Sequence, residues 1–182
     1  MTGYYDALEI RDPGRREREQ FAALRQQIEN AQRNAPYFAE LLEGVDSAAI
    51  ENRAALAQLP VTRKSDLTGL QKARPPFAQM TAQGMDGLSR VFMSPGPTFD
   101  AEGRGPDYWR FARAMFAAGF RKGELVYNTF SYHFTPAGFM ADLGAQALGC
   151  TVFPGGTGQT EMQVAAIAAL KPACYVGTPT FL

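Results

Sequence analysis

The feature that most constrains the fold is the scarcity of charge in the last third of the chain. Residues 123–182 contain only four charged side chains, Glu124, Asp142, Glu161 and Lys171, although charged residues make up 20% of the whole sequence. Charged side chains are almost never fully buried, so a segment with so few of them is mostly interior. Its apolar runs alternate between strand-like and helix-like lengths, which is typical of a parallel sheet with helices on both faces.

The alternation predicts a doubly wound, mostly parallel α/β fold. Strands are expected over 125–130, 151–153 and 173–176, and helices over 136–148 and 160–170. Gly149 ends the first of these helices, and Thr160 with Gln163 has the spacing of a capping box for the second. The glycines at 155–158 either form the turn before that second helix or make a phosphate-binding loop, and we favour the turn.

The first 87 residues predict a helical region. Within residues 11–33, Phe21, Leu24, Ile28 and Ala31 recur at helical spacing, behind the N-cap candidate Asp12. Further helices are expected over 37–42 and, in two short pieces, over 52–70, followed by a loop over 73–87. The chain is therefore expected to comprise a helical region, 1–87, and an α/β region, 88–182.

The junction between these regions carries the first candidate for chemistry. A strand is expected over 88–94, a loop rich in proline and glycine over 94–106, and a helix from Pro106 through Ala118. A glycine-rich loop after a strand can surround a phosphate with backbone N–H groups and hydroxyls, which Ser94, Gly96 and Thr98 would supply. An ordinary turn accounts for the same composition, and on these residues alone we favour it.

Charge balance argues against two classes of partner. Eighteen basic residues offset eighteen acidic ones, so no long-range field attracts nucleic acid or an anionic membrane. The start of the chain lacks the features of a signal peptide, and no apolar run approaches the ~20 residues that span a bilayer. Cys150 and Cys174 lie in apolar stretches, as free thiols in a reducing compartment would, so a cytoplasmic location is expected.

Several segments, taken in order, resemble the N-terminal portion of phenylacetate-coenzyme A ligases, which are adenylate-forming enzymes. The similar segments are Leu-Pro-Val-Thr-Arg-Lys-Ser-Asp-Leu at 59–67, the loop at 94–100, Gly-Phe-Arg-Lys-Gly-Glu-Leu-Val-Tyr-Asn at 119–128, Leu-Gly-Cys-Thr-Val-Phe-Pro-Gly-Gly-Thr at 148–157, Gln-Thr-Glu-Met-Gln at 159–163 and Gly-Thr-Pro-Thr at 177–180. Several spaced motifs in one order are more specific than any single motif. The resemblance covers roughly residues 50–182.

This resemblance implies ATP, Mg²⁺ and coenzyme A as cofactors and an aryl carboxylic acid as substrate. It places nucleotide contacts at Ser94, Gly96 and Thr98, within a loop that is Ser-Ser-Gly-Thr-Thr-Gly-Lys in the family. Here Pro95 and Pro97 remove backbone donors, while Phe99 and Asp100 replace the glycine and the lysine. Each such loss is expected to cost about 3 kcal/mol of transition-state stabilisation.

The resemblance also implies an aryl-acid pocket. Phe130, Tyr132, His133 and Phe134 follow a predicted strand, at the carboxyl edge where α/β sheets bind ligands. Phe130 and Tyr132 coincide with aromatic positions of the family segment and are expected to form pocket walls. His133 is the only histidine, and we expect it to be packed or hydrogen-bonded rather than catalytic.

The sequence is expected to represent the leading part of a ligase, inactive by itself, because the family's later catalytic motifs lie outside residues 1–182. One alternative is a non-catalytic paralogue that serves as a binding or assembly module, favoured by the altered loop. Another is an acyl-activating relative with a fatty or different aryl acid as substrate. An incomplete sheet would expose apolar surface, so a homodimer is a further expectation.

Overall fold

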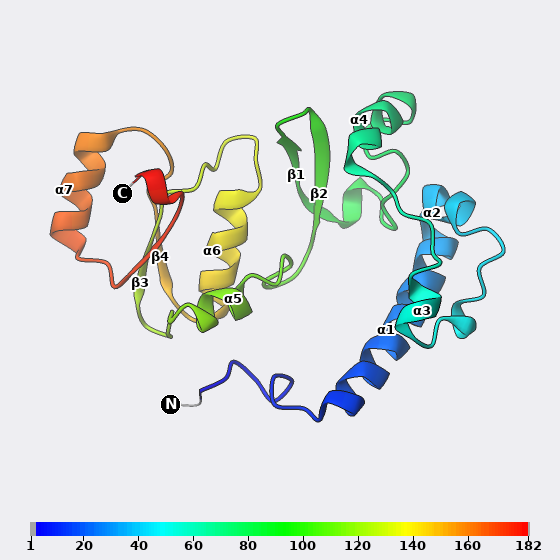
Figure 1. The fold of residues 1–182 in the computed structure, drawn as a ribbon. Helices are drawn as coiled ribbons and strands as arrows, with labels where there is room; N and C mark the ends of the chain where they lie inside the picture. Colours follow the sequence, from blue (N-terminus) through cyan, green and yellow to red (C-terminus); the bar gives the residue numbers. More distant parts are fainter. Residues whose placement is uncertain (1–2, 182) are drawn as a thin grey trace. The chain divides into compact units, whose positions relative to one another are not determined.

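The computed structural model describes residues 3–181, which divide into two compact units. One unit comprises Asp6–Val91 with Gly96–Ala101; the other comprises Phe92–Pro95 and the chain from Glu102 onward, together with the residues up to Tyr5. Each unit is described by itself. The helices and strands of both are labelled in Figure 1.

Short and long helices make up most of the first unit. Its elements are α1 (Pro13–Asn34), α2 (Pro36–Leu41), α3 (Arg53–Leu56) and α4 (Lys64–Ala73), with 3₁₀ turns at Ser47–Ala49 and Met85–Gly87. As predicted, Asp12 caps α1, accepting a hydrogen bond from the backbone N–H of Arg15 at 2.8 Å. The core of the first unit is a cluster of Ile28, Leu42 and Ile50, so the apolar stripe of α1 faces the inside of this unit.

The second unit contains a three-stranded parallel sheet with strand order β4-β3-β5. Its elements are α5 (Ala112–Ala117), β3 (Leu125–Asn128), α6 (Ala137–Ala147), β4 (Thr151–Pro154), α7 (Thr160–Leu170), β5 (Cys174–Val176) and a 3₁₀ turn at Pro179–Phe181. The chain moves from β3 to one edge and then back across β3 to the other. Right-handed crossovers in opposite directions place α6 and α7 on opposite faces, as Figure 1 shows. The doubly wound fold is therefore confirmed.

The core of this unit lies between the sheet and the α5–α6 pair. Met115, Phe120, Val126, Ala145 and Cys150 form its buried cluster, which agrees with the low charge of the segment. On α7, by contrast, Gln163 is the one buried residue among those described, and several apolar side chains of that helix are exposed. No helix within the described part of the chain is long and apolar enough to cross a membrane.

Two predictions around the proline- and glycine-rich segment are wrong. The segment contains a strand, β2 (Thr98–Gly103), which pairs with β1 (Leu88–Ser94) in a two-stranded sheet. The predicted helix over 106–118 is shortened to α5, since Asp107 and Arg110 take left-handed φ angles of 47° and 57° that no helix accommodates. The Asp107 carboxylate accepts hydrogen bonds from the two backbone N–H groups that start α5, at 2.7 and 3.1 Å.

The predicted capping box of α7 is also wrong. The N-cap is Gln159, in a left-handed conformation and without a side-chain cap. The Gln163 side chain points back instead, and its amide donates to the carbonyls of Gly156 and Gly158 at 3.1 and 2.7 Å. These bonds, with left-handed φ angles at both glycines, fit the turn interpretation of residues 155–158.

Candidate functional site

The first candidate site is the tip of the β1–β2 pair. Ser94 ends β1, Gly96 takes a φ of 117° in the connection, and Thr98 begins β2 with only 3% of its surface exposed. The Gly96 carbonyl accepts a hydrogen bond from the Thr68 hydroxyl of α4 at 2.8 Å. The tip is therefore anchored to a helix of the first unit.

A second anchor holds the residue after Thr98. The Gln71 side chain of α4 accepts from the Phe99 backbone N–H at 2.8 Å and donates to the Phe99 carbonyl at 2.9 Å. The sequence did not predict that Gln71 binds the backbone of Phe99, because a glutamine within a helix carries no local sign of a distant backbone partner. The contact consumes the N–H of Phe99, and Pro95 and Pro97 have none, so few backbone donors remain for an anion.

The second candidate site is the aromatic segment between β3 and α6. Asn128, fully buried, donates through its amide to Tyr132 Oη at 2.8 Å and to the Gly138 carbonyl at 2.9 Å. Its amide oxygen accepts from the Phe130 N–H at 3.0 Å. One side chain thus fixes both ends of the segment, and Phe130 lies half-buried at its start.

Tyr132 is held inside this network. Its hydroxyl donates to the Asp142 carboxylate of α6 at 3.2 Å, and its ring meets Phe139 edge to face at a centroid distance of 5.2 Å. Burial, followed by the negative charge of Asp142, raises the pKa of Tyr132 well above its ordinary value. The hydroxyl is occupied on both sides, so Tyr132 can offer a ligand its ring but no spare hydrogen bond.

Phe134 is the most exposed member of the aromatic segment. Its side chain is 71% exposed, and its φ of 60° is unusual for a bulky residue. Its carbonyl accepts from the Met93 N–H at 2.9 Å, which places the end of β1, where Ser94 lies, beside the aromatic segment. His133 is also exposed, so of the two expected environments the packed one is excluded; its backbone N–H donates to Ser131 Oγ at 3.1 Å and therefore has no ligand role.

An apolar groove of about 340 Å³ lies in the same unit, between α5 and the end of β5. Met115 and Phe120 form part of its wall, and Val176, Gly177 and Pro179 line its rim. Gly177 and Pro179 belong to the Gly-Thr-Pro-Thr segment noted in the sequence, and Val176 ends β5. The sequence did not predict the groove, which depends on the packing of α5 against a strand far along the chain.

Metal binding has little support from this chain's own side chains. Within residues 3–181, no group of three or more His, Cys, Asp or Glu side chains is placed to hold a metal ion. Among these described residues, the side chains present do not fit Mg²⁺.

Known proteins resemble this chain in sequence and in structure. No protein-family model matches the sequence. The chain is 32% identical over 172 residues to phenylacetate-coenzyme A ligase of Aromatoleum evansii, covering 90% of this chain and 38% of that protein. It is 32% identical over 155 residues to the enzyme of the same name from Thermus thermophilus, covering 80% of this chain and 34% of that one. The chain thus spans little more than a third of the length of these relatives.

Solved structures also show similarity to CoA ligases. The chain matches 2-hydroxyisobutyryl-CoA ligase in complex with 2-HIB-AMP and CoA, with a TM-score of 0.84 and 26% identity over 93% of this chain and 38% of that one. The fold is therefore that of acyl-CoA ligases that form an acyl-adenylate. More particularly, the expected resemblance to the N-terminal portion of phenylacetate-CoA ligases is confirmed.

Proposed function

We propose that this chain serves as the N-terminal region of an ATP-dependent aryl acid–CoA ligase of the phenylacetate-CoA ligase type. The observation that carries the proposal is the hydrogen bond from Met93 to Phe134, which joins the end of β1 to the aromatic segment. An acid bound against the aromatic side chains at this place would lie close to Ser94 at the end of β1. Such proximity is what an attack of the acid on a nucleotide requires.

The proposed reaction has two steps. A carboxylate oxygen of the acid attacks the α-phosphorus of ATP, releasing pyrophosphate and forming an acyl-adenylate. The thiol sulfur of CoA then attacks the acyl carbon, and AMP leaves. Oriented donors stabilise the charge that gathers on the phosphate during the first step.

We assign the acid side of this chemistry to the aromatic segment. Phe130, Tyr132, His133 and Phe134 would enclose the acid, with Asn128 holding the segment in place. Ser94, Gly96 and Thr98 are proposed to contact the nucleotide. Since Pro95 and Pro97 leave the loop with fewer backbone donors, we expect residues 1–182 alone to bind the acid without completing adenylation.

Two assays test this assignment. Ligand-observed NMR with phenylacetate should detect weak binding to the 182-residue chain, which Phe134→Ala weakens at least about fivefold by removing an exposed ring. The control is Phe99→Ala, another partly exposed phenylalanine, which should leave acid binding unchanged. ATP–pyrophosphate exchange should be absent. Binding indifferent to Phe134→Ala would overturn the pocket, and turnover by the chain alone would overturn the expected inactivity.

The Gln71–Phe99 contact favours a second candidate, a non-catalytic paralogue that keeps the fold as a binding or assembly module. In that case the loop is a structural turn and no nucleotide binds. Calorimetric titration of the chain with ATP distinguishes the ligase from the non-catalytic module. ATP binding that Gly96→Ala abolishes supports the ligase, whereas no detectable ATP binding supports the module.

We further propose a cytoplasmic location and self-association through apolar surface. The two free cysteines support a reducing compartment, and the exposed Met162 and Val164 of α7 support an apolar contact between copies. Sedimentation of wild type and Met162→Glu tests the second point. A concentration-dependent dimer that the substitution dissociates would support it, and a monomer at all concentrations would refute it.

A further inference from the structure

A groove with two different ends runs along the first half of α1. It consists of three adjoining open hollows of about 330 to 510 Å³, and all three are lined by Glu17 of α1 and Arg53 of α3. Along α1 they extend from Pro13 to Leu24, eleven residues apart. At about 1.5 Å per residue this is roughly 16 Å, or about three helical turns.

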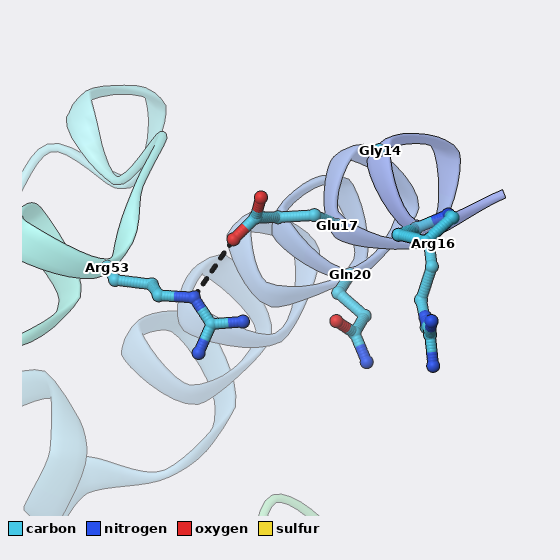
Figure 2. Close-up of a pocket in the computed structure, with 6 residues that line it drawn as sticks. Gly14, Arg16, Glu17, Gln20 and Arg53 are labelled. Carbon is cyan, nitrogen blue, oxygen red and sulfur yellow. Dashed lines mark hydrogen bonds and ion pairs between the residues drawn. The ribbon is translucent and has the colours of Figure 1, made fainter.

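One end of the groove carries unpaired positive charge, because its two carboxylates, Glu17 and Glu51, are already paired with Arg53 and Arg25. Arg16 and Gln20 are four residues apart on α1 and project from the same side of the helix, while Arg53 reaches it from α3 (Figure 2). Arg53 pairs with Glu17 through Nε at 2.9 Å, so both of its terminal nitrogens can still receive a carboxylate. Within residues 3–181 neither Arg16 nor Arg18 makes an ion pair, unlike Arg15, which pairs with Glu19.

The other end is apolar. Phe21 and Leu24 of α1 and Leu56 of α3 line it, and Leu56 is 40% exposed. Leu24 also packs against the core of this unit, so its position is fixed, and Phe21 is partly buried. The N-terminus of α1, which is the positive end of the helix dipole, lies at the Arg16 end of the groove and adds to the positive potential there.

We propose that this groove docks an acidic amphipathic helix of a partner protein. A helix of about three turns matches its length, apolar side chains spaced by three and four residues match Phe21, Leu24 and Leu56, and carboxylates match the arginines. An open groove leaves one side of any occupant in water, whereas small-molecule sites bury about 70–90% of their ligand. Shape thus favours a helix over a small amphiphile, and charge selects an acidic one.

The test uses the 182-residue chain and a fluorescein-labelled helical peptide with leucines at positions i, i+3 and i+7 and glutamates at one end. Anisotropy should show saturable binding that weakens at least about tenfold when NaCl rises from about 50 to about 500 mM. Arg16→Glu and Arg53→Glu should each weaken binding at least about fivefold, and Leu56→Ala about threefold. Arg63→Glu is the matched control, because it makes the same charge change on an exposed arginine outside the groove.

Three results would overturn the proposal. The first is equal binding of a peptide that carries lysines in place of the glutamates. The second is an Arg63→Glu effect as large as that of Arg16→Glu, which would show that only net charge matters. The third is binding of dodecyl phosphate, followed by NMR shifts at Phe21 and Leu24, with no binding of the peptide. Circular dichroism of each variant establishes that a loss of binding is not a loss of folding.

Discussion

Gly177 offers the sharpest test of the packing around β5. A methyl group at this position would lie 2.0 Å from Thr129 Oγ1 and 2.5 Å from Tyr175 Oη, distances that real contacts do not reach. Thr129 is 1% exposed, and its hydroxyl is hydrogen-bonded to that of Tyr175 at 2.7 Å. The alanine side chain therefore cannot be accommodated without breaking this contact.

The expected loss of stability follows from two contributions. Overpacking by one methyl group costs about 1–3 kcal/mol, and loss of the Thr129–Tyr175 hydrogen bond adds about 1 kcal/mol. Gly177→Ala should therefore lower the free energy of unfolding by about 2–4 kcal/mol. Thr129→Ala, which removes the hydroxyl and also the buried γ-methyl group, should cost about 1–2 kcal/mol.

Urea unfolding followed by the fluorescence of Trp109 is the suitable assay, because the single tryptophan lies in the same unit as Gly177. In the double variant Gly177→Ala/Thr129→Ala, the oxygen that the methyl group meets is gone. The two changes should then cost at least about 1 kcal/mol less than their sum. A cost of Gly177→Ala below about 0.5 kcal/mol, or strict additivity, would refute the reasoning.

Three further predictions concern other contacts. Gln71→Leu should destabilise the chain by about 1–3 kcal/mol and speed hydrogen exchange of the Phe99 amide, measured by NMR; unchanged exchange would contradict the contact. Burial, followed by Glu124, raises the pKa of Cys174 to about 11, so alkylation by iodoacetamide at pH 8 should be on the order of a hundredfold slower than in urea, and equal rates would refute this. The Cys174 thiol and the Arg121 N–H hold the pKa of Glu124 low, so its carboxylate stabilises the fold above its unfolded pKa. Glu124→Gln should therefore lower the urea midpoint at pH 7, and this difference should shrink as the pH falls from the unfolded pKa of about 4.3 through the lower folded pKa; a pH-independent difference would contradict this.

Much of the secondary structure could be predicted from local patterns. The stripe from Phe21 to Ala31 and the N-cap Asp12 correctly placed α1, and the charge-poor alternation correctly placed three parallel strands with α6 and α7. These signals are strong because each depends on residues within one element. Low charge marked the interior at β3 and α6, but it failed at α7, where Met162, Val164 and Leu170 are exposed.

The errors arose where tertiary contacts decide local conformation. Proline and glycine around Thr98 indicated a loop, yet pairing with β1 makes β2 there. The Asp107 carboxylate delays the start of α5, and the Gln163 side chain serves the preceding turn rather than a cap. In the candidate site, the aromatic residues were visible in the sequence, but their supports Asn128 and Asp142 were not, because those bonds form only when β3 and α6 pack together.

The Asn128 contacts also have a consequence for how this connection can vary among related proteins. The amide ties Phe130 at the start of the connection to Gly138 beyond its end, and a side chain on Gly138 would come within 2.7 Å of the Ser131 carbonyl. Insertions or deletions beside Phe130 or Gly138 would break the hydrogen bonds by which Asn128 holds the two ends of this connection together. Sequence changes are therefore tolerated best at the exposed His133 and Phe134, where a new side chain alters the surface and leaves the Asn128 contacts intact.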